Sequence, residues 1–138
     1  MMVLVDTPIW SLALRRSGDR LNPREQKLRG ALEQLIGDGM VALPGAIRQE
    51  LLSGIREPGQ YERLRRSLRA FPDISLSVED YEEAARLSNR CRAEGIAGSA
   101  VDFLLCGVAL RRPWTIFTSD GDFARYATCA PIRLLTLP

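Results

Sequence analysis

The sequence contains no histidine. This absence excludes every site that needs an imidazole: a Ser-His-Asp triad, a Cys-His pair, an HExxH zinc site and a ribonuclease that uses histidine for acid–base catalysis. Any catalysis by this chain must therefore use carboxylates, hydroxyls, arginines, thiols or a metal ion held by oxygen ligands.

Long apolar segments are also missing. No run approaches the roughly 20 residues that a membrane-spanning helix needs, and the chain does not open with the basic segment of a secretory signal. The 138 residues are 46% apolar and 26% charged, the balance of a soluble globular domain. We expect one domain over residues 1–138, in a cytoplasmic protein that does not bind membranes.

Cysteine is scarce, and its spacing matches no common metal-binding or disulfide motif. The three cysteines are Cys91, Cys106 and Cys129, an odd number without a CxxC motif. Disulfide frameworks and zinc ribbons usually show an even count or paired spacing. We therefore expect three free thiols that fill small apolar spaces in a reducing compartment.

Lysine is nearly absent, because 18 of the 19 basic residues are arginine. Four of these arginines, Arg63, Arg65, Arg66 and Arg69, cluster in one predicted helix. Such a cluster is either a solvated helix face or a surface that binds RNA or a protein partner.

Short apolar runs alternate with helical patterns along the chain. Strands are predicted at residues 2–5, 40–43, 114–118 and 132–137, with a weak one at 74–78. Helices are predicted from Thr7-Pro8, with Thr7 as the cap, and at 22–37, 44–53, 61–71, 79–94, 99–111 and 123–127. This alternation predicts an α/β domain with a mostly parallel sheet of four or five strands.

Three acidic residues follow predicted strands. Asp6 ends the first strand, and Asp120 and Asp122 follow the strand at 114–118. Taken singly, each is an ordinary turn or capping residue. Because ligands bind beyond the carboxyl ends of parallel strands, the three together predict a site at this edge of the sheet.

Two more acids lie on predicted helices. Glu50 lies on the apolar face of its helix and needs a partner there, which an ion pair with Arg48 or Arg56 would also supply. Asp102 lies in the first turn of an apolar helix after Ser99, either as the second half of a capping box or facing an interior cleft.

Together these segments offer five carboxylates and the hydroxyls of Thr7, Thr118 and Ser119. Clustered carboxylates repel one another and resist ionising. A divalent cation removes that repulsion, and oxygen ligands favour Mg²⁺ or Mn²⁺. With the five acids set aside, 19 basic residues stand against 12 acidic ones, a balance of +7. An acidic metal site in a basic shell is typical of enzymes that act on polyphosphate substrates.

Four segments resemble the PIN-domain nucleases, and among these the VapC-type toxins of bacterial toxin–antitoxin operons. The segments are Val5-Asp6-Thr7-Pro8-Ile9-Trp10, Arg48-Gln49-Glu50-Leu51-Leu52-Ser53-Gly54, Ala100-Val101-Asp102-Phe103-Leu104-Leu105-Cys106 and Thr118-Ser119-Asp120-Gly121-Asp122-Phe123. The resemblance implies a single three-layer α/β/α PIN-like domain.

The same resemblance implies a Mg²⁺-dependent endoribonuclease, with Mn²⁺ as the other candidate ion. Asp6, Glu50, Asp102 and Asp120 match the family's catalytic, metal-binding positions, and Asp122 would be a further metal-binding acid. The implied partners are an RNA substrate, a second copy in a homodimer, and a small antitoxin in a hetero-oligomeric complex.

Three other interpretations stay open on the sequence. A PIN nuclease that matures RNA would have no antitoxin. An α/β phosphatase-type hydrolase would have paired acids directly after its first strand, whereas Asp6 stands alone. A binding module without turnover would use the acids for structural ion pairs that need no Mg²⁺.

Overall fold

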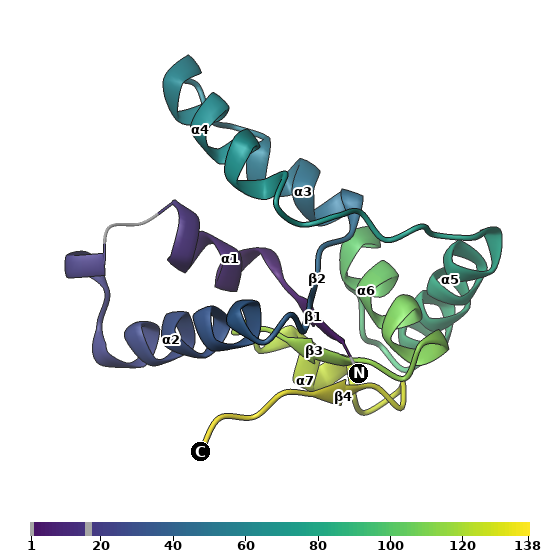
Figure 1. Ribbon diagram of the computed structural model, residues 1–138. Coiled ribbons are helices and arrows are strands. Elements are labelled where there is room, and N and C mark those ends of the chain that lie inside the picture. The colour runs from purple at the N-terminus through teal and green to yellow at the C-terminus, as the bar shows by residue number, and fades with distance from the viewer. Residues whose placement is uncertain (1, 16–17) are drawn as a thin grey trace.

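Four short parallel strands form the central sheet (Figure 1). The structure is a computed structural model that describes residues 2–15 and 18–138. The strand order is β2-β1-β3-β4, where β1 is Val3–Val5, β2 is Val41–Ala42, β3 is Thr115–Phe117 and β4 is Arg133–Leu134. Val5 pairs with Phe117, so the segments that follow β1 and β3 leave the sheet side by side.

Helices flank the strands on both sides, which confirms the predicted α/β/α arrangement. The helices α1 (Thr7–Leu14) and α2 (Pro23–Gly37) lie on one side, and α5 (Val78–Ala93) and α6 (Ala100–Arg111) on the other (Figure 1). The β1 residues are at most 3% exposed, because a strand covered on both faces is apolar throughout.

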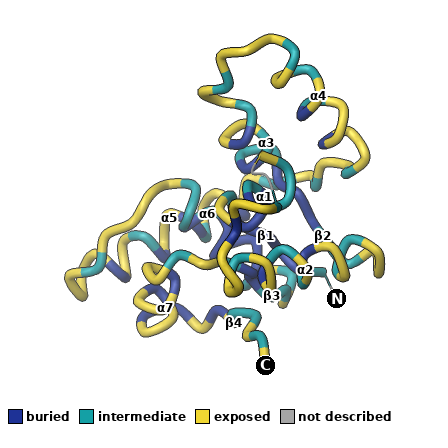
Figure 2. The backbone as a smooth tube through the Cα atoms, turned by 90° about the vertical axis from the view of Figure 1, so that its left-hand side faces the viewer, coloured by how far each residue is buried: buried dark blue, intermediate teal, exposed yellow. Residues whose placement is uncertain are grey.

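The remaining helical elements complete the fold. They are the 3-10 turn η1 (Gly18–Arg20), α3 (Gly45–Leu52), α4 (Pro58–Leu68) and α7 (Asp122–Tyr126). The α4 helix stands farthest from the sheet and is mostly exposed (Figures 1 and 2). In the described part of the chain, no helix combines the length and apolar character needed to cross a membrane.

The cap of α1 and the start of α4 differ from the prediction, and the other α-helices begin within one residue of their predicted starts. Asp6, not Thr7, caps α1, because Asp6 Oδ1 accepts a hydrogen bond from Thr7 N at 2.8 Å. The α4 helix begins at Pro58 rather than Tyr61, because the Glu57 carboxylate accepts from the backbone N–H groups of the first turn. Pro58 is well suited to a first helical position, so the helix starts there.

The weak strand predicted at residues 74–78 is wrong, and the last strand is shorter than predicted. Leu43 and Asp73 form an isolated parallel bridge, residues 74–77 follow without regular structure, and α5 begins at Val78. β4 covers two residues of the expected 132–137. An alternating pattern favours extended backbone, but pairing also needs a neighbouring strand within reach.

A buried carboxylate joins α5 to the end of α6. Asp80 is fully buried and accepts from Arg111 Nε at 2.9 Å and from both terminal nitrogens of Arg112 at 2.7 and 2.9 Å. It also accepts from Ser77 N, which completes a capping box. The hydrogen bonds from Arg112 outweigh burial and hold the pKa of Asp80 well below its usual range. The charge therefore stays paired, and α6 is fixed against α5.

The prediction of three free thiols is wrong for two of them. Cys91, near the end of α5, forms a disulfide with Cys129, which follows α7, with 5.6 Å between the Cα atoms. Cys106 is free and buried, as predicted. The two bridged cysteines are 38 residues apart, and only the packing of α7 near the end of α5 brings them together. Counting and spacing cysteines could not reveal this contact.

We predict that reducing this disulfide lowers the thermal midpoint of the protein. Opening a bridge across 38 residues releases chain entropy worth about 4 kcal/mol in the unfolded state. Scanning calorimetry with and without dithiothreitol measures the change, and the variant Cys91→Ala/Cys129→Ala should be insensitive to the reductant. A count of three reactive thiols in denatured, unreduced protein would contradict the bridge.

Candidate active site

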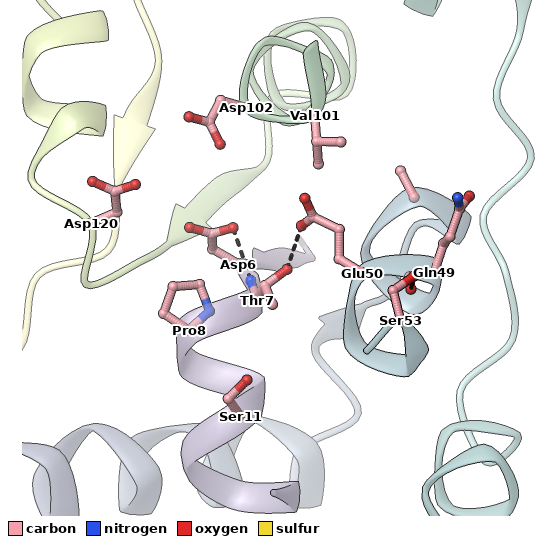
Figure 3. A pocket seen from close by; sticks show the side chains of 11 residues that line it. Asp6, Thr7, Pro8, Ser11, Gln49, Glu50, Ser53, Val101, Asp102 and Asp120 are labelled. Atoms are coloured by element: carbon pink, nitrogen blue, oxygen red, sulfur yellow. Dashed lines mark hydrogen bonds between the residues drawn. The ribbon is translucent and has the colours of Figure 1, made fainter. Parts of the chain in front are cut away.

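Four acidic side chains from four separate segments line one cavity (Figure 3). Asp6 follows β1, Glu50 lies on α3, Asp102 lies on α6, and Asp120 follows β3. The cavity has a volume of about 800 Å³. The structure thus brings together the four residues predicted to be catalytic.

Asp6 is the most buried of the four, with 5% of its surface exposed. Its Oδ1 accepts from Thr7 N, and its Oδ2 accepts from Thr118 Oγ1, both at 2.8 Å. Burial raises the pKa of Asp6 from 3.8 to about 6, against the lowering effect of these two hydrogen bonds. The charges of Asp102 and Asp120 raise it further. The site therefore destabilises the ionised form of Asp6 relative to its protonated form.

Glu50 lies at the exposed side of the cavity. Its Oε1 accepts a hydrogen bond from Thr7 Oγ1 at 2.6 Å, so the partner of this exposed carboxylate is a hydroxyl and not an arginine. Arg48 turns away, donating to the carbonyls of Leu68 and Phe71 at 2.9 and 2.6 Å. Among the described residues, Glu50 forms no ion pair with Arg48 or Arg56, and Arg48 lies 3.5 Å from Asp73 instead, so the alternative of a structural ion pair is wrong.

Asp102 forms only half of a capping box. Its backbone N–H donates to Ser99 Oγ at 3.1 Å. Its side chain does not return the bond to Ser99, and Oδ2 instead accepts from the Tyr126 hydroxyl at 2.7 Å. Burial and this hydrogen bond raise the pKa of Tyr126, so the hydroxyl stays a donor. The carboxylate of Asp102 is thus oriented from α7 and not by its own helix.

Asp120 and Asp122 are held differently. Asp120 N donates to Thr118 Oγ1 at 3.0 Å, and its Oδ1 accepts from Asp122 N at 2.9 Å. Asp122 itself is exposed, its carboxylate lies 3.6 Å from Arg125 Nη1, and it is not among the residues that line the cavity. Ser119 is exposed and likewise lies outside the lining.

Sequence reasoning missed three residues of the site. Ser11 and Ser53 also line the cavity, and helical spacing could have found them, because Ser11 lies one turn after Thr7 and Ser53 one turn after Glu50. Tyr126 had no such signal. An aromatic residue in a short predicted helix indicates core packing, and nothing in its spacing points to an acid 24 positions earlier.

A comparison with models of protein families identifies the family of this chain. The sequence model described as "PIN domain" matches residues 3–128. The chain belongs to the PIN domain family. PIN domains are generally nucleases, and they generally use divalent metal ions. No curated protein sequence matches the chain.

Solved structures share the PIN fold of this chain at low sequence identity. One is VapBC2 from Rickettsia felis bound to a promoter DNA fragment, with 19% identity, a TM-score of 0.75 and full coverage of both chains. Another is FitAcB from Neisseria gonorrhoeae, with 19% identity, a TM-score of 0.75, and coverage of 98% of this chain and 97% of that one. FitAB bound to an IR36 DNA fragment gives 19% identity, a TM-score of 0.72, and coverage of 97% and 94%.

The donor set of this PIN domain fits a hard divalent cation, because all four acids supply carboxylate oxygens. Among the described residues, no hydrogen bond engages Asp102 Oδ1, Asp120 Oδ2 or Glu50 Oε2. Across residues 2–15 and 18–138, however, no three acidic or thiol side chains are grouped closely enough to hold a metal ion as they stand. Ion binding would therefore require these carboxylates to draw together.

We predict that Asp6→Asn stabilises the metal-free protein above about pH 6 and not near pH 4. The raised pKa means that folded Asp6 keeps its proton where the unfolded chain has lost it. The contribution of Asp6 to stability is therefore full below its unfolded pKa of 3.8, falls as the pH rises to about 6, and stays low above that. Asparagine cannot ionise and avoids this loss.

Thermal denaturation in EDTA across this pH range tests the prediction. The matched control is Glu33→Gln, a change of an exposed acid on α2, which should follow the wild-type pH dependence. An Asp6→Asn midpoint that differs from wild type by the same amount at every pH would contradict the prediction.

Proposed function

We propose that this PIN domain is a Mg²⁺-dependent endoribonuclease that acts as the toxin of a toxin–antitoxin pair. The observation that carries the proposal is the convergence of Asp6, Glu50, Asp102 and Asp120 on one cavity in a chain of this family. The VapBC and FitAB structures that share its fold support the toxin role. Mn²⁺ has the same ligand preference and could replace Mg²⁺.

The four carboxylates would hold the cation between them. When bound, the cation would supply an activated water and neutralise charge on the scissile phosphate. Thr118 fixes Asp6, and Thr7 fixes Glu50, so two acids are oriented before any ligand arrives. Asp122, the fifth predicted metal ligand, would act from the rim through the bond of its backbone to Asp120.

The absence of histidine shapes the expected products. No imidazole is available to deprotonate the 2′-hydroxyl of the substrate, so attack by water is the favoured route. We expect RNA fragments with 5′-phosphate and 3′-hydroxyl ends. Products with 2′,3′-cyclic phosphate would contradict this mechanism.

We predict that Asp6→Asn and Asp102→Asn each reduce RNA cleavage by roughly two orders of magnitude or more while the protein stays folded. Glu50→Gln should also reduce cleavage strongly. Asp122→Asn should reduce it less than Asp120→Asn, because the Asp122 side chain lies outside the cavity lining. Cleavage of labelled RNA with Mg²⁺ and with EDTA measures the effects, and end sequencing identifies the products.

Three outcomes would replace the proposal. Full cleavage in EDTA would exclude the metal-dependent mechanism. Folded protein that neither binds Mg²⁺ nor cleaves RNA would favour the binding module, in which the acids have only structural roles. Cleavage by a protein with no neighbouring antitoxin gene would favour an RNA-maturation nuclease.

A second cavity has a volume of about 640 Å³. It lies among the end of α1, the segment after α3, and α4, and its lining includes Arg15, Arg56 and Arg63. We propose that an acidic segment of the antitoxin binds here. Arg65 and Arg66 do not line this cavity and lie 2.5 and 3.9 Å from Glu62, whereas Arg63, which lines it, lies 3.9 Å from Glu57. Arg16, which follows Arg15 in the sequence, lies outside the described residues.

We predict that Arg56→Ala/Arg63→Ala weakens the complex with the small protein encoded beside this chain and leaves RNA cleavage near wild type. The matched control, Arg65→Ala/Arg66→Ala, should leave the complex intact, because those arginines lie on the same helix but outside the cavity lining. Calorimetry measures the complex, and the salt dependence of RNA binding shows whether either variant removes a contact with phosphate. Equal effects of the two variants on the complex would contradict antitoxin binding at the second cavity.

The proposed assembly is a homodimer that forms a hetero-oligomer with the antitoxin in the cytoplasm. Light scattering of the toxin alone and with its antitoxin measures both stoichiometries.

A further inference from the structure

Tyr126 connects the core of the protein to the acidic cavity. The residue ends α7 and is fully buried, yet its hydroxyl reaches Asp102 Oδ2 at 2.7 Å. Buried tyrosine hydroxyls need a polar partner. Here the partner is one of the four carboxylates that line the cavity, although Tyr126 itself is not part of the lining.

The ring of Tyr126 is held on several sides. Its centroid lies 4.8 Å from that of Phe103 on α6 and 5.1 Å from that of Phe123 on α7. Its backbone carbonyl accepts from the N–H groups of Cys129 and Ala130 at 3.0 and 2.9 Å. Cys129 is in turn bonded to Cys91 of α5. A side chain fixed in this way can impose an orientation on the flexible carboxylate that it contacts.

Gly98 leaves the space that the hydroxyl occupies. A Cβ atom at this position would lie 2.6 Å from Tyr126 Cζ and closer still to the hydroxyl oxygen. Gly98 lies in the exposed loop between α5 and α6 and does not have the positive φ that favours glycine elsewhere. The close approach of Tyr126, and not backbone conformation, is therefore what requires glycine here.

We propose that Tyr126 is a positioning residue, which fixes Asp102 through Oδ2 so that Oδ1 faces the cavity for metal binding. Groups that hydrogen-bond to metal ligands orient them, and their loss typically lowers metal affinity 10- to 100-fold. Tyr126 suits this role because its hydroxyl is neutral and donates a hydrogen bond to Asp102 without being part of the cavity lining. The inference rests on the proposed function and deepens it by assigning how one ligand is oriented.

A structural role for Tyr126 makes a different prediction. If Asp102 served only to satisfy a buried hydroxyl, removing that hydroxyl would change stability and leave metal binding as it was. Metal affinity and thermal stability therefore have to be measured on the same variants.

The test variant is Tyr126→Phe, which removes the hydroxyl and keeps the ring. We expect its affinity for Mn²⁺, measured by electron paramagnetic resonance of the free ion, to fall by roughly 10-fold or more. In RNA cleavage, kcat at subsaturating Mg²⁺ should fall and recover at high Mg²⁺, while KM for RNA stays near wild type. The matched control is Tyr81→Phe, a tyrosine that is 56% exposed on α5, which should match wild type in every measurement.

A second variant keeps the hydroxyl and moves it. Gly98→Ala should displace Tyr126 and weaken Mn²⁺ binding in the same direction, whereas Gly30→Ala, with open space around it on α2, should not. Because both changes act through Asp102, Gly98→Ala should add little in the Tyr126→Phe background.

Wild-type Mn²⁺ affinity in folded Tyr126→Phe, or tighter binding, would overturn the positioning role while leaving the nuclease proposal in place. Failure of the nuclease proposal has a different signature, which is wild-type protein that neither binds Mn²⁺ nor cleaves RNA, and that result would overturn both.

Discussion

The structure depends on a buried carboxylate at the end of its central strand. Asp6 caps α1, accepts a hydrogen bond from the segment after β3, and faces two further acids across the cavity. Its position follows from β1, because a strand covered by helices on both faces delivers its next residue into the interior. The result is a carboxyl group whose pKa is raised to about 6, so its charged form is less stable than that of an exposed aspartate.

Three hydroxyls organise the acids around Asp6. Thr118 donates to Asp6, Thr7 donates to Glu50, and Tyr126 donates to Asp102. Each hydroxyl belongs to a different segment from the carboxylate that it orients, so the network connects α1, α3, α6 and α7 with the strand ends. Neutral donors of this kind orient carboxylates without cancelling their charge, which leaves the negative potential of the cavity available to a cation.

Two kinds of link join the elements on the α5–α6–α7 side of the domain. The ion pairs of Asp80 lock α6 against α5, and the Cys91–Cys129 bridge fastens the segment after α7 to the end of α5. Asp102 and Tyr126 both lie within this unit. The bridge and the expected cytoplasmic location point to opposite redox conditions, because the cytoplasm keeps thiols reduced. Its redox state would therefore determine how firmly this unit is held.

The sequence by itself determined the α/β alternation, the parallel sheet and the four acids, because strand ends and helix turns carry local signals of composition and spacing. The missing histidine likewise restricted the chemistry, because composition alone excludes every imidazole-based mechanism. The cap of α1 and the start of α4 depended on which side chain accepts hydrogen bonds from the first N–H groups. The sequence prediction misplaced the cap by one residue and the start by three.

Only the tertiary structure decided the partners of those residues. Three contacts join positions far apart in the chain: Thr7 with Glu50, Cys91 with Cys129, and Tyr126 with Asp102. Likewise, residues 74–77 form no strand, because pairing depends on a distant neighbour. Such contacts are set by how whole helices pack, and periodicity in a single sequence indicates which face of a helix is buried but not which residue that face meets.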